Sequence, residues 1–273
     1  MSQESPPTRR GFIGGIVTGA AVGLSGCAGE NNGSEPSGSV NGFESVAVEG
    51  VDLVIDFEEG HPFEALSVIQ SDGELFAERD LAPGVRQERI ELGTTYPPGE
   101  YEVIGVSDGN EEATTSLVVE PNVAINRLRL GRNHPDEMYE EASDRTIQTE
   151  VILDIENTGN GPEAAVSLEF SGDIPRPTPD DFEDSGIYDT DSELGGHADQ
   201  IVLPPGETTV IYSHSTPFNP ASDNVSCTPD GEQGEFEIEL ITSVVDPNPS
   251  QQYSVTYTGE DLADCDIETE VVQ

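Results

Sequence analysis

Apolar and polar residues alternate with a period of two over most of the chain after residue 43. Residues 51–57 read Val-Asp-Leu-Val-Ile-Asp-Phe, and after the Pro-Pro-Gly turn at 97–99 the alternation puts Tyr101, Val103 and Gly105 on one face. Because successive side chains of a strand point to opposite faces, this period predicts half-buried strands. Short strands about 8 to 12 residues apart, separated by Gly and Pro turns, are typical of a β-sandwich. The predicted fold class is therefore all-β.

The alternating segments fall into two groups, which predict two immunoglobulin-like β-sandwich domains. The Glu-Pro-Asn sequence at 120–122 interrupts the alternation, so we place the first domain at 43–120 and the second at 121–273. In the second domain, strands at 149–156 and 165–170 flank a turn rich in Asn and Gly. The two domains together account for the chain beyond its N-terminal 42 residues.

Several short motifs of the second domain resemble those of a known family. The two strands around the Asn- and Gly-rich turn, together with the Pro-Pro-Gly-Glu turn at 204–207 and the strand that follows it, are similar to those of CARDB domains. These are adhesion-type immunoglobulin-like domains of archaeal cell-surface proteins, and the resemblance covers roughly residues 123–258. It implies an immunoglobulin-like sandwich, and it bears on the fold more than on any function.

The N-terminus carries the marks of an export signal. Arg9 and Arg10 precede an apolar run at 11–23, which is shorter than the roughly 20 residues that span a bilayer. The run ends in Leu-Ser-Gly-Cys, which resembles the lipobox of lipoproteins exported through twin-arginine signals. The resemblance implies that residues 1–26 are removed and that Cys27 takes a lipid, which would anchor an extracytoplasmic protein to the cell membrane. Residues 27–42 are rich in Gly, Ser, Asn and Glu and are expected to form a flexible tether.

The charge of the chain is extreme. There are 55 acidic residues against 10 basic ones, so the formal net charge is −45. Self-repulsion of this size destabilises a compact state unless salt screens it. The composition resembles that of exported proteins of halophilic archaea. Disorder is the competing interpretation of high net charge, and the persistent β-type alternation argues against it.

The absence of lysine excludes several functions. All the basic residues are arginines, so the chain lacks the lysine of a P-loop and the amine of a Schiff-base enzyme. An acidic surface also repels phosphate backbones, which excludes nucleic acid as a partner. The mature chain has no Gly-x-Ser-x-Gly elbow of a serine hydrolase.

Cysteine usage predicts one disulfide. Removing Cys27 as the lipid acceptor leaves Cys227 and Cys265, an even pair in an oxidising compartment. Two separate buried thiols are the alternative. Two glycosylation sequons, which begin at Asn32 and Asn224, lie in the tether and in an expected surface loop.

The histidines are expected to be scattered over the surface. They lack the spacing of HxxH or HExxH zinc motifs, and neither Cys227 nor Cys265 is followed by the His that a blue-copper site needs. The sequence therefore predicts no bound transition metal and no cofactor. The four histidines are His61, His134, His197 and His214.

The stretch 172–199 interrupts the β pattern with many Asp, Glu and Pro residues. We expect a solvated insertion, although loops longer than about 15 residues often carry function. Asp189, Asp191 and Glu193 offer hard oxygen ligands for calcium, but the frame of an EF-hand loop is missing. A solvated acidic loop is therefore the favoured interpretation.

Taken together, these features predict a protein without enzymatic activity that is anchored to the membrane by lipid. Its expected role is binding, adhesion or service as an accessory module, with a protein or an envelope polymer as partner. The alternative is an extracytoplasmic enzyme or a solute-binding component with its site in the 172–199 insertion or between the domains. A deep pocket lined by convergent polar groups would favour the alternative.

Overall fold

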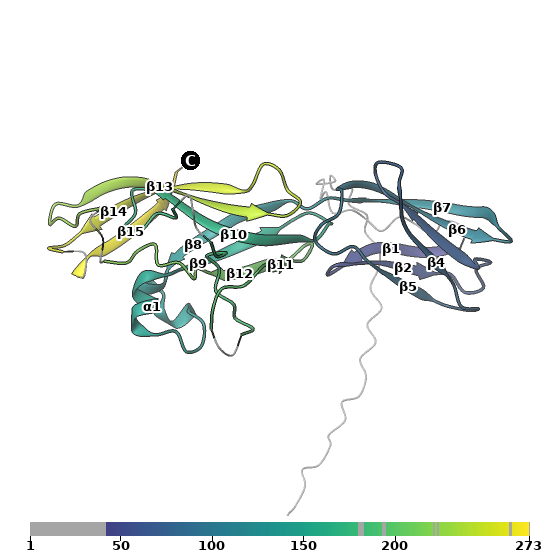
Figure 1. Ribbon diagram of the computed structural model, residues 1–273, viewed down its shortest axis with the longest axis horizontal. Coiled ribbons are helices and arrows are strands. Elements are labelled where there is room, and N and C mark those ends of the chain that lie inside the picture. The colour runs from purple at the N-terminus through teal and green to yellow at the C-terminus, as the bar shows by residue number, and fades with distance from the viewer. Residues whose placement is uncertain are drawn as a thin grey trace, which may run out of the picture. The chain divides into compact units, whose positions relative to one another are not determined.

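The computed structural model describes residues 42–179, 183–192, 195–220, 222, 224–261 and 264–272 (Figure 1). Residues 1–41 lie outside this part of the chain, and with them Arg9, Arg10, Cys27 and Asn32. Strands dominate the described residues, and helical structure is limited to three short segments. The predicted all-β class is therefore confirmed.

The first sandwich consists of two antiparallel sheets. One sheet has the order β1-β2-β5 and the other has the order β4-β3-β6-β7. The strands are β1 (Phe43–Glu49), β2 (Asp52–Phe57), β3 (Ala65–Ile69), β4 (Leu75–Asp80), β5 (Gln87–Glu91), β6 (Gly99–Ser107) and β7 (Asn110–Val119).

The alternation seen in the sequence matches the burial of these strands. Tyr101 and Val103 of β6 are both fully buried, as their spacing predicts. The hydroxyl of Tyr101 donates a hydrogen bond of 2.8 Å to the carbonyl oxygen of Pro97. A buried tyrosine bonded to the backbone a few residues upstream is the tyrosine corner of many β-sandwiches. This bond satisfies the polar end of a side chain that otherwise fills the core.

The second sandwich also has two antiparallel sheets, with its own hydrophobic core. The sheets have the orders β12-β9-β8 and β11-β10-β13-β14-β15. The strands are β8 (Val123–Leu130), β9 (Val151–Asn157), β10 (Glu163–Gly172), β11 (Ile201–Leu203), β12 (Thr208–Tyr212), β13 (Glu232–Thr242), β14 (Ser250–Thr258) and β15 (Asp266–Val271). Although β9 and β10 flank a short turn, they belong to different sheets and together enclose the core.

Helical structure appears between β8 and β9, where the sequence pattern predicts none. Two 3₁₀ turns, η1 (Gly131–Asn133) and η2 (Pro135–Glu137), are followed by the helix α1 (Asp144–Thr149). The Ser143 hydroxyl accepts a hydrogen bond of 3.2 Å from the backbone amide of Thr146, which caps the first turn of α1. Within the described residues, no helix is both long and apolar enough to cross a membrane.

The 172–199 insertion is less solvated than expected. Ile174, Ile187 and Ala198 belong to the core of the second sandwich. The backbone of Ile187 bridges to Ser213, and that of Tyr188 bridges to His197. These bridges hold the insertion against the residues around β12. Isolated apolar residues in an acidic stretch have no period, so the sequence could not indicate that they are buried.

Candidate functional site

Three tyrosines from separate segments meet on the second sandwich. The rings of Tyr139 and Tyr188 are stacked with their centroids 3.8 Å apart, and Tyr212 meets Tyr139 edge-on at 5.2 Å. Tyr139 follows η2, Tyr188 lies in the insertion and Tyr212 ends β12. The backbone amide of Tyr188 donates to the carbonyl oxygen of Tyr212 over 2.8 Å. The insertion is therefore hydrogen-bonded to β12, the strand that carries Tyr212.

A surface pocket of about 470 Å³ opens beside the stacked tyrosines. Its lining combines these rings with exposed carboxylates and small polar residues. It is formed by Tyr139, Glu140, Glu141, Tyr188, Thr190, Ser192 and Gly195. Aromatic rings and carboxylates provide contacts for a ligand that is partly apolar or cationic.

A buried carboxyl group lies behind this aromatic cluster. The side chain of Glu150 is only 6% exposed, and it accepts a hydrogen bond of 3.3 Å from the Tyr139 hydroxyl. Removal from water raises the pKa of Glu150 to about 8, although the bond from Tyr139 opposes the shift. Burial, followed by the nearby carboxyl of Glu150, raises the pKa of Tyr139 well above its usual value. Both groups are therefore neutral at mildly acidic pH.

This pKa predicts that alkali destabilises the second sandwich. The folded state holds the Glu150 proton more tightly than the unfolded state, whose pKa is near 4.5. The contribution of Glu150 to stability is therefore fully present below about pH 4.5 and is lost as the pH rises to about 8. Replacing Glu150 with Gln removes this titration, so the stability of E150Q relative to the wild type should rise by up to about 5 kcal/mol as the pH increases from 4.5 to above 8.

Urea denaturation in molar salt at pH 5 and pH 9 measures this difference. The matched control is Glu140→Gln, which removes an exposed carboxylate from the same cluster. It should change the two midpoints equally and only slightly. If the difference in unfolding free energy between E150Q and the wild type does not widen from pH 5 to pH 9, the pKa of Glu150 is not raised by burial.

Two histidines whose spacing in the sequence matches no metal-binding motif lie close together near the tyrosines. The donor atoms of His197, His214 and Asp184 all lie within 4.8 Å of one another. The His214 and Asp184 side chains approach to 4.0 Å, and the rings of His197 and His214 have centroids 6.1 Å apart. Sequence spacing missed this cluster because its members come from three segments that only the fold brings together. Within the described residues, His61 and His134 lie in no such cluster.

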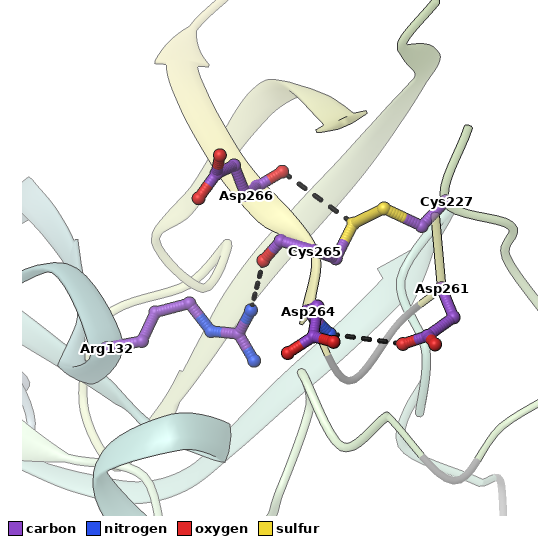
Figure 2. The surroundings of a disulfide bond; sticks show 6 residues. All are labelled: Arg132, Cys227, Asp261, Asp264, Cys265 and Asp266. Atoms are coloured by element: carbon purple, nitrogen blue, oxygen red, sulfur yellow. Dashed lines mark hydrogen bonds between the residues drawn. A yellow bond between two sulfur atoms is a disulfide. The ribbon is translucent and has the colours of Figure 1, made fainter. Parts of the chain in front are cut away.

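The predicted disulfide is present. Cys227 and Cys265 are bonded with their Cα atoms 6.0 Å apart, in the surroundings shown in Figure 2. The guanidinium of Arg132 donates to the carbonyl oxygen of Cys265 over 2.8 Å. The side-chain amide of Asn133 donates to the carbonyl oxygen of Ile267 over 3.0 Å. Two residues of η1 thus hold the start of β15 beside the disulfide.

The other residues singled out in the sequence do not form a site among the described residues. Asp189 accepts a hydrogen bond of 2.9 Å from the backbone amide of Asp191, which is a local turn, and Glu193 lies outside the described residues. Calcium binding there stays a prediction. Asn224 is exposed, and its side-chain amide donates to the carbonyl oxygen of Pro175 over 3.0 Å.

Comparison with known proteins finds likeness only among solved structures. No protein-family model matches the chain, and no curated protein matches it. A glycosyl hydrolase family 2 member from Bacteroides cellulosilyticus aligns with 81% of this chain at 13% identity and a TM-score of 0.23. A segment of two fibronectin type-III domains from chicken tenascin aligns with 85% of the chain at 7% identity and a TM-score of 0.27. The human OSCAR ligand-binding domain aligns with 83% at 9% identity and a TM-score of 0.21.

These alignments differ in how much of each neighbour they cover. The chain spans 24% of the Bacteroides hydrolase, 99% of the tenascin segment and 92% of the OSCAR domain. At these TM-scores the likeness carries no argument about activity, ligand or partner.

Proposed function

We propose that this protein is a binding module on the cell surface, tethered to the membrane by a lipid on Cys27. The observation that carries the binding role is the pocket beside Tyr139 and Tyr188, which is open to solvent at the surface of an all-β scaffold and is not the deep pocket that would favour the alternative. Binding residues are often found on loops that a rigid scaffold positions. The pocket is lined from such connections, namely the segment between η2 and α1 and the 172–199 insertion.

The tether and the anchor rest on the N-terminal sequence. Arg9 and Arg10, the short apolar run and the lipobox-like residues up to Cys27 support export and lipidation. A diacyl-type anchor holds a protein at a membrane, whereas a single chain binds only marginally. A net charge of −45 supports a salt-rich exterior as the working environment. The partner in this proposal is a protein or an envelope polymer of the same surface.

Replacing Cys27 with Ser tests the anchor. The wild-type chain should separate with the membranes and lack residues 1–26, because lipidation and cleavage go together at a lipobox. The C27S variant should appear in the medium or accumulate as the uncleaved precursor. Fractionation of cells followed by mass spectrometry of the N-terminus measures both outcomes, and Ser37→Ala in the tether is the matched control. A wild-type chain found entirely in the aqueous fraction with Met1 intact would refute the anchor.

The same membranes test the binding role. Wild-type protein cross-linked in native membranes at molar salt should recover one partner reproducibly, and an excess of purified wild-type protein should compete for that partner. Binding in the absence of any chemical change to the partner is the expected result. Turnover of an envelope polymer that persists through purification to homogeneity would overturn the proposal in favour of an enzyme.

A further inference from the structure

The cluster of Asp184, His197 and His214 is built on a hydrogen-bonded frame. The backbone amide of His214 donates to the carbonyl oxygen of Gly186 over 2.7 Å. The amide of Ala198 donates to the carbonyl oxygen of Ile187 over 2.9 Å. The three segments that carry the cluster are therefore joined through their backbones, next to the buried side chains of Ile187 and Ala198.

The carboxylate of the cluster is held in place by a local turn. Its Oδ1 accepts a hydrogen bond of 2.9 Å from the backbone amide of Gly186, two residues further along the chain. Its Oδ2 is the atom that lies 4.0 Å from Nδ1 of His214. Metal-binding carboxylates are commonly fixed in this way, with one oxygen held by the protein and the other directed at the ion.

The distances fit a metal ion after a small adjustment. Tetrahedral ligands about 2.1 Å from a zinc ion are about 3.4 Å from one another. Donor atoms within 4.8 Å of one another can all lie within about 2.8 Å of a common point, so each has to move by only about 0.7 Å. His197 is exposed and the side chains of His214 and Asp184 are about one-third exposed, so rotation about their side-chain bonds can supply this movement.

An ordinary surface ion pair does not account for all three residues. A histidine beside a carboxylate contributes little to stability when both are exposed to solvent. Such a pair explains Asp184 and His214, but it gives no reason for a second imidazole at the same place. The chain contains a histidine–carboxylate pair elsewhere, because Nδ1 of His134 lies 2.9 Å from Oε1 of Glu137, and among the described residues this pair belongs to no metal-type cluster.

We propose that Asp184, His197 and His214 bind one divalent transition metal ion of the zinc class. Two imidazole nitrogens and one carboxylate favour zinc and its neighbours over calcium and magnesium, which prefer sites made entirely of oxygen. Three protein ligands leave at least one coordination position for water or for a donor from a ligand. The site adjoins the three tyrosines at two points. The backbone of His197 bridges to that of Tyr188, which lines the pocket, and His214 follows Tyr212 by two residues along the chain.

Isothermal titration of zinc into the purified full-length chain tests the proposal. The protein should carry no polyhistidine tag, and molar sodium chloride should be present to screen the acidic surface. The wild type should bind one zinc ion per chain and should not bind calcium at the same place. His197→Ala, His214→Ala and Asp184→Asn should each weaken zinc binding by more than about 10-fold, since residues that only orient the ligands contribute about 10- to 100-fold.

The matched control is His134→Ala, which removes a histidine paired with a single carboxylate. It should leave zinc affinity unchanged. Circular dichroism of each variant checks that the β-structure is intact. We expect it to be intact in H197A because His197 is exposed. Equal zinc affinity in H197A, H214A and the wild type would overturn the proposal. Failure of the wild type to bind zinc would also overturn the proposal. Binding of several ions that none of these substitutions affects would overturn it as well, because it would show adsorption to the acidic surface.

The proposal does not rest on the lipid anchor or on capture of a partner. Zinc binding could fail while C27S still releases the protein from the membrane, and the reverse is equally measurable. The zinc site and the membrane anchor can therefore be refuted independently of each other.

Discussion

Replacing Cys227 and Cys265 together with Ala should lower the free energy of unfolding of the second sandwich by about 4 kcal/mol. The bond joins residues separated by 38 positions, so it removes many conformations from the unfolded chain. In the folded state it ties the segment before β13 to the start of β15. Most domains are stable by only about 5–15 kcal/mol, so a loss of this size should leave the sandwich marginal.

Urea denaturation in molar salt measures the loss as a shift of the midpoint at unchanged slope. Wild-type protein treated with a reductant should behave like the double variant. Cys27→Ser serves as the control, because it removes the remaining cysteine and should leave the midpoint where it is. Equal midpoints for the oxidised wild type and the double variant would show that the cross-link does not stabilise the fold. Two alkylatable thiols in the unfolded, unreduced protein would show that the cross-link is not formed.

Glu163→Ala is expected to destabilise the second sandwich by about 3–5 kcal/mol. Glu163 is 0% exposed at the start of β10, and its carboxylate accepts hydrogen bonds from several backbone amides. One is its neighbour on β10, and the others lie in the loop after β13. These donors are the amides of Ala164, Ser243, Val244 and Val245, at 2.7 to 3.1 Å. Truncation leaves several donors without an acceptor, which costs more than the bonds themselves contribute.

A second substitution separates the lost acceptor from the lost volume. Glu163→Gln keeps the shape of the side chain but replaces one accepting oxygen with a donor, so it should fall between the wild type and E163A. Glu169→Ala on the same strand is the matched control, because its side chain is only half-buried. It should change stability by less than about 0.5 kcal/mol. Thermal unfolding at fixed salt compares the four proteins, and an E163A midpoint equal to that of E169A would rule out a structural role for the buried carboxylate.

The strands could be predicted from the sequence because one face of each strand is buried, which makes apolar residues recur at every second position. Tyr101 and Val103 fall on one face by simple alternation, and the structure buries both. The disulfide was also predictable, since setting aside Cys27 as the expected lipid acceptor leaves Cys227 and Cys265 as a single pair. Both inferences need only local pattern or counting, so they do not depend on knowing how the sheets pack.

The candidate sites could not be predicted in the same way. His197 and His214 meet Asp184 only because backbone bridges place the insertion beside the end of β12. Glu163 is a glutamate among 55 acidic residues, and nothing in its neighbours distinguishes it from the exposed ones. Its carboxylate accepts from the amides of three residues in a distant loop, Ser243, Val244 and Val245, as well as from that of its neighbour. Long-range contacts of this kind leave no period in the sequence.

The hydrogen bonds from η1 to the chain near Cys265 bear on how the disulfide forms. Arg132 donates to the carbonyl oxygen of Cys265 (Figure 2). Asn133 donates to that of Ile267, so β15 has positioning contacts other than the disulfide. Strand β15 is therefore held beside η1 and β14 by hydrogen bonds as well as by the disulfide. If these contacts form before oxidation, they would bring Cys265 to its partner in the correct register. A chain that matures in this order would pair Cys227 with Cys265 by proximity, which is compatible with the lipid that we propose on Cys27.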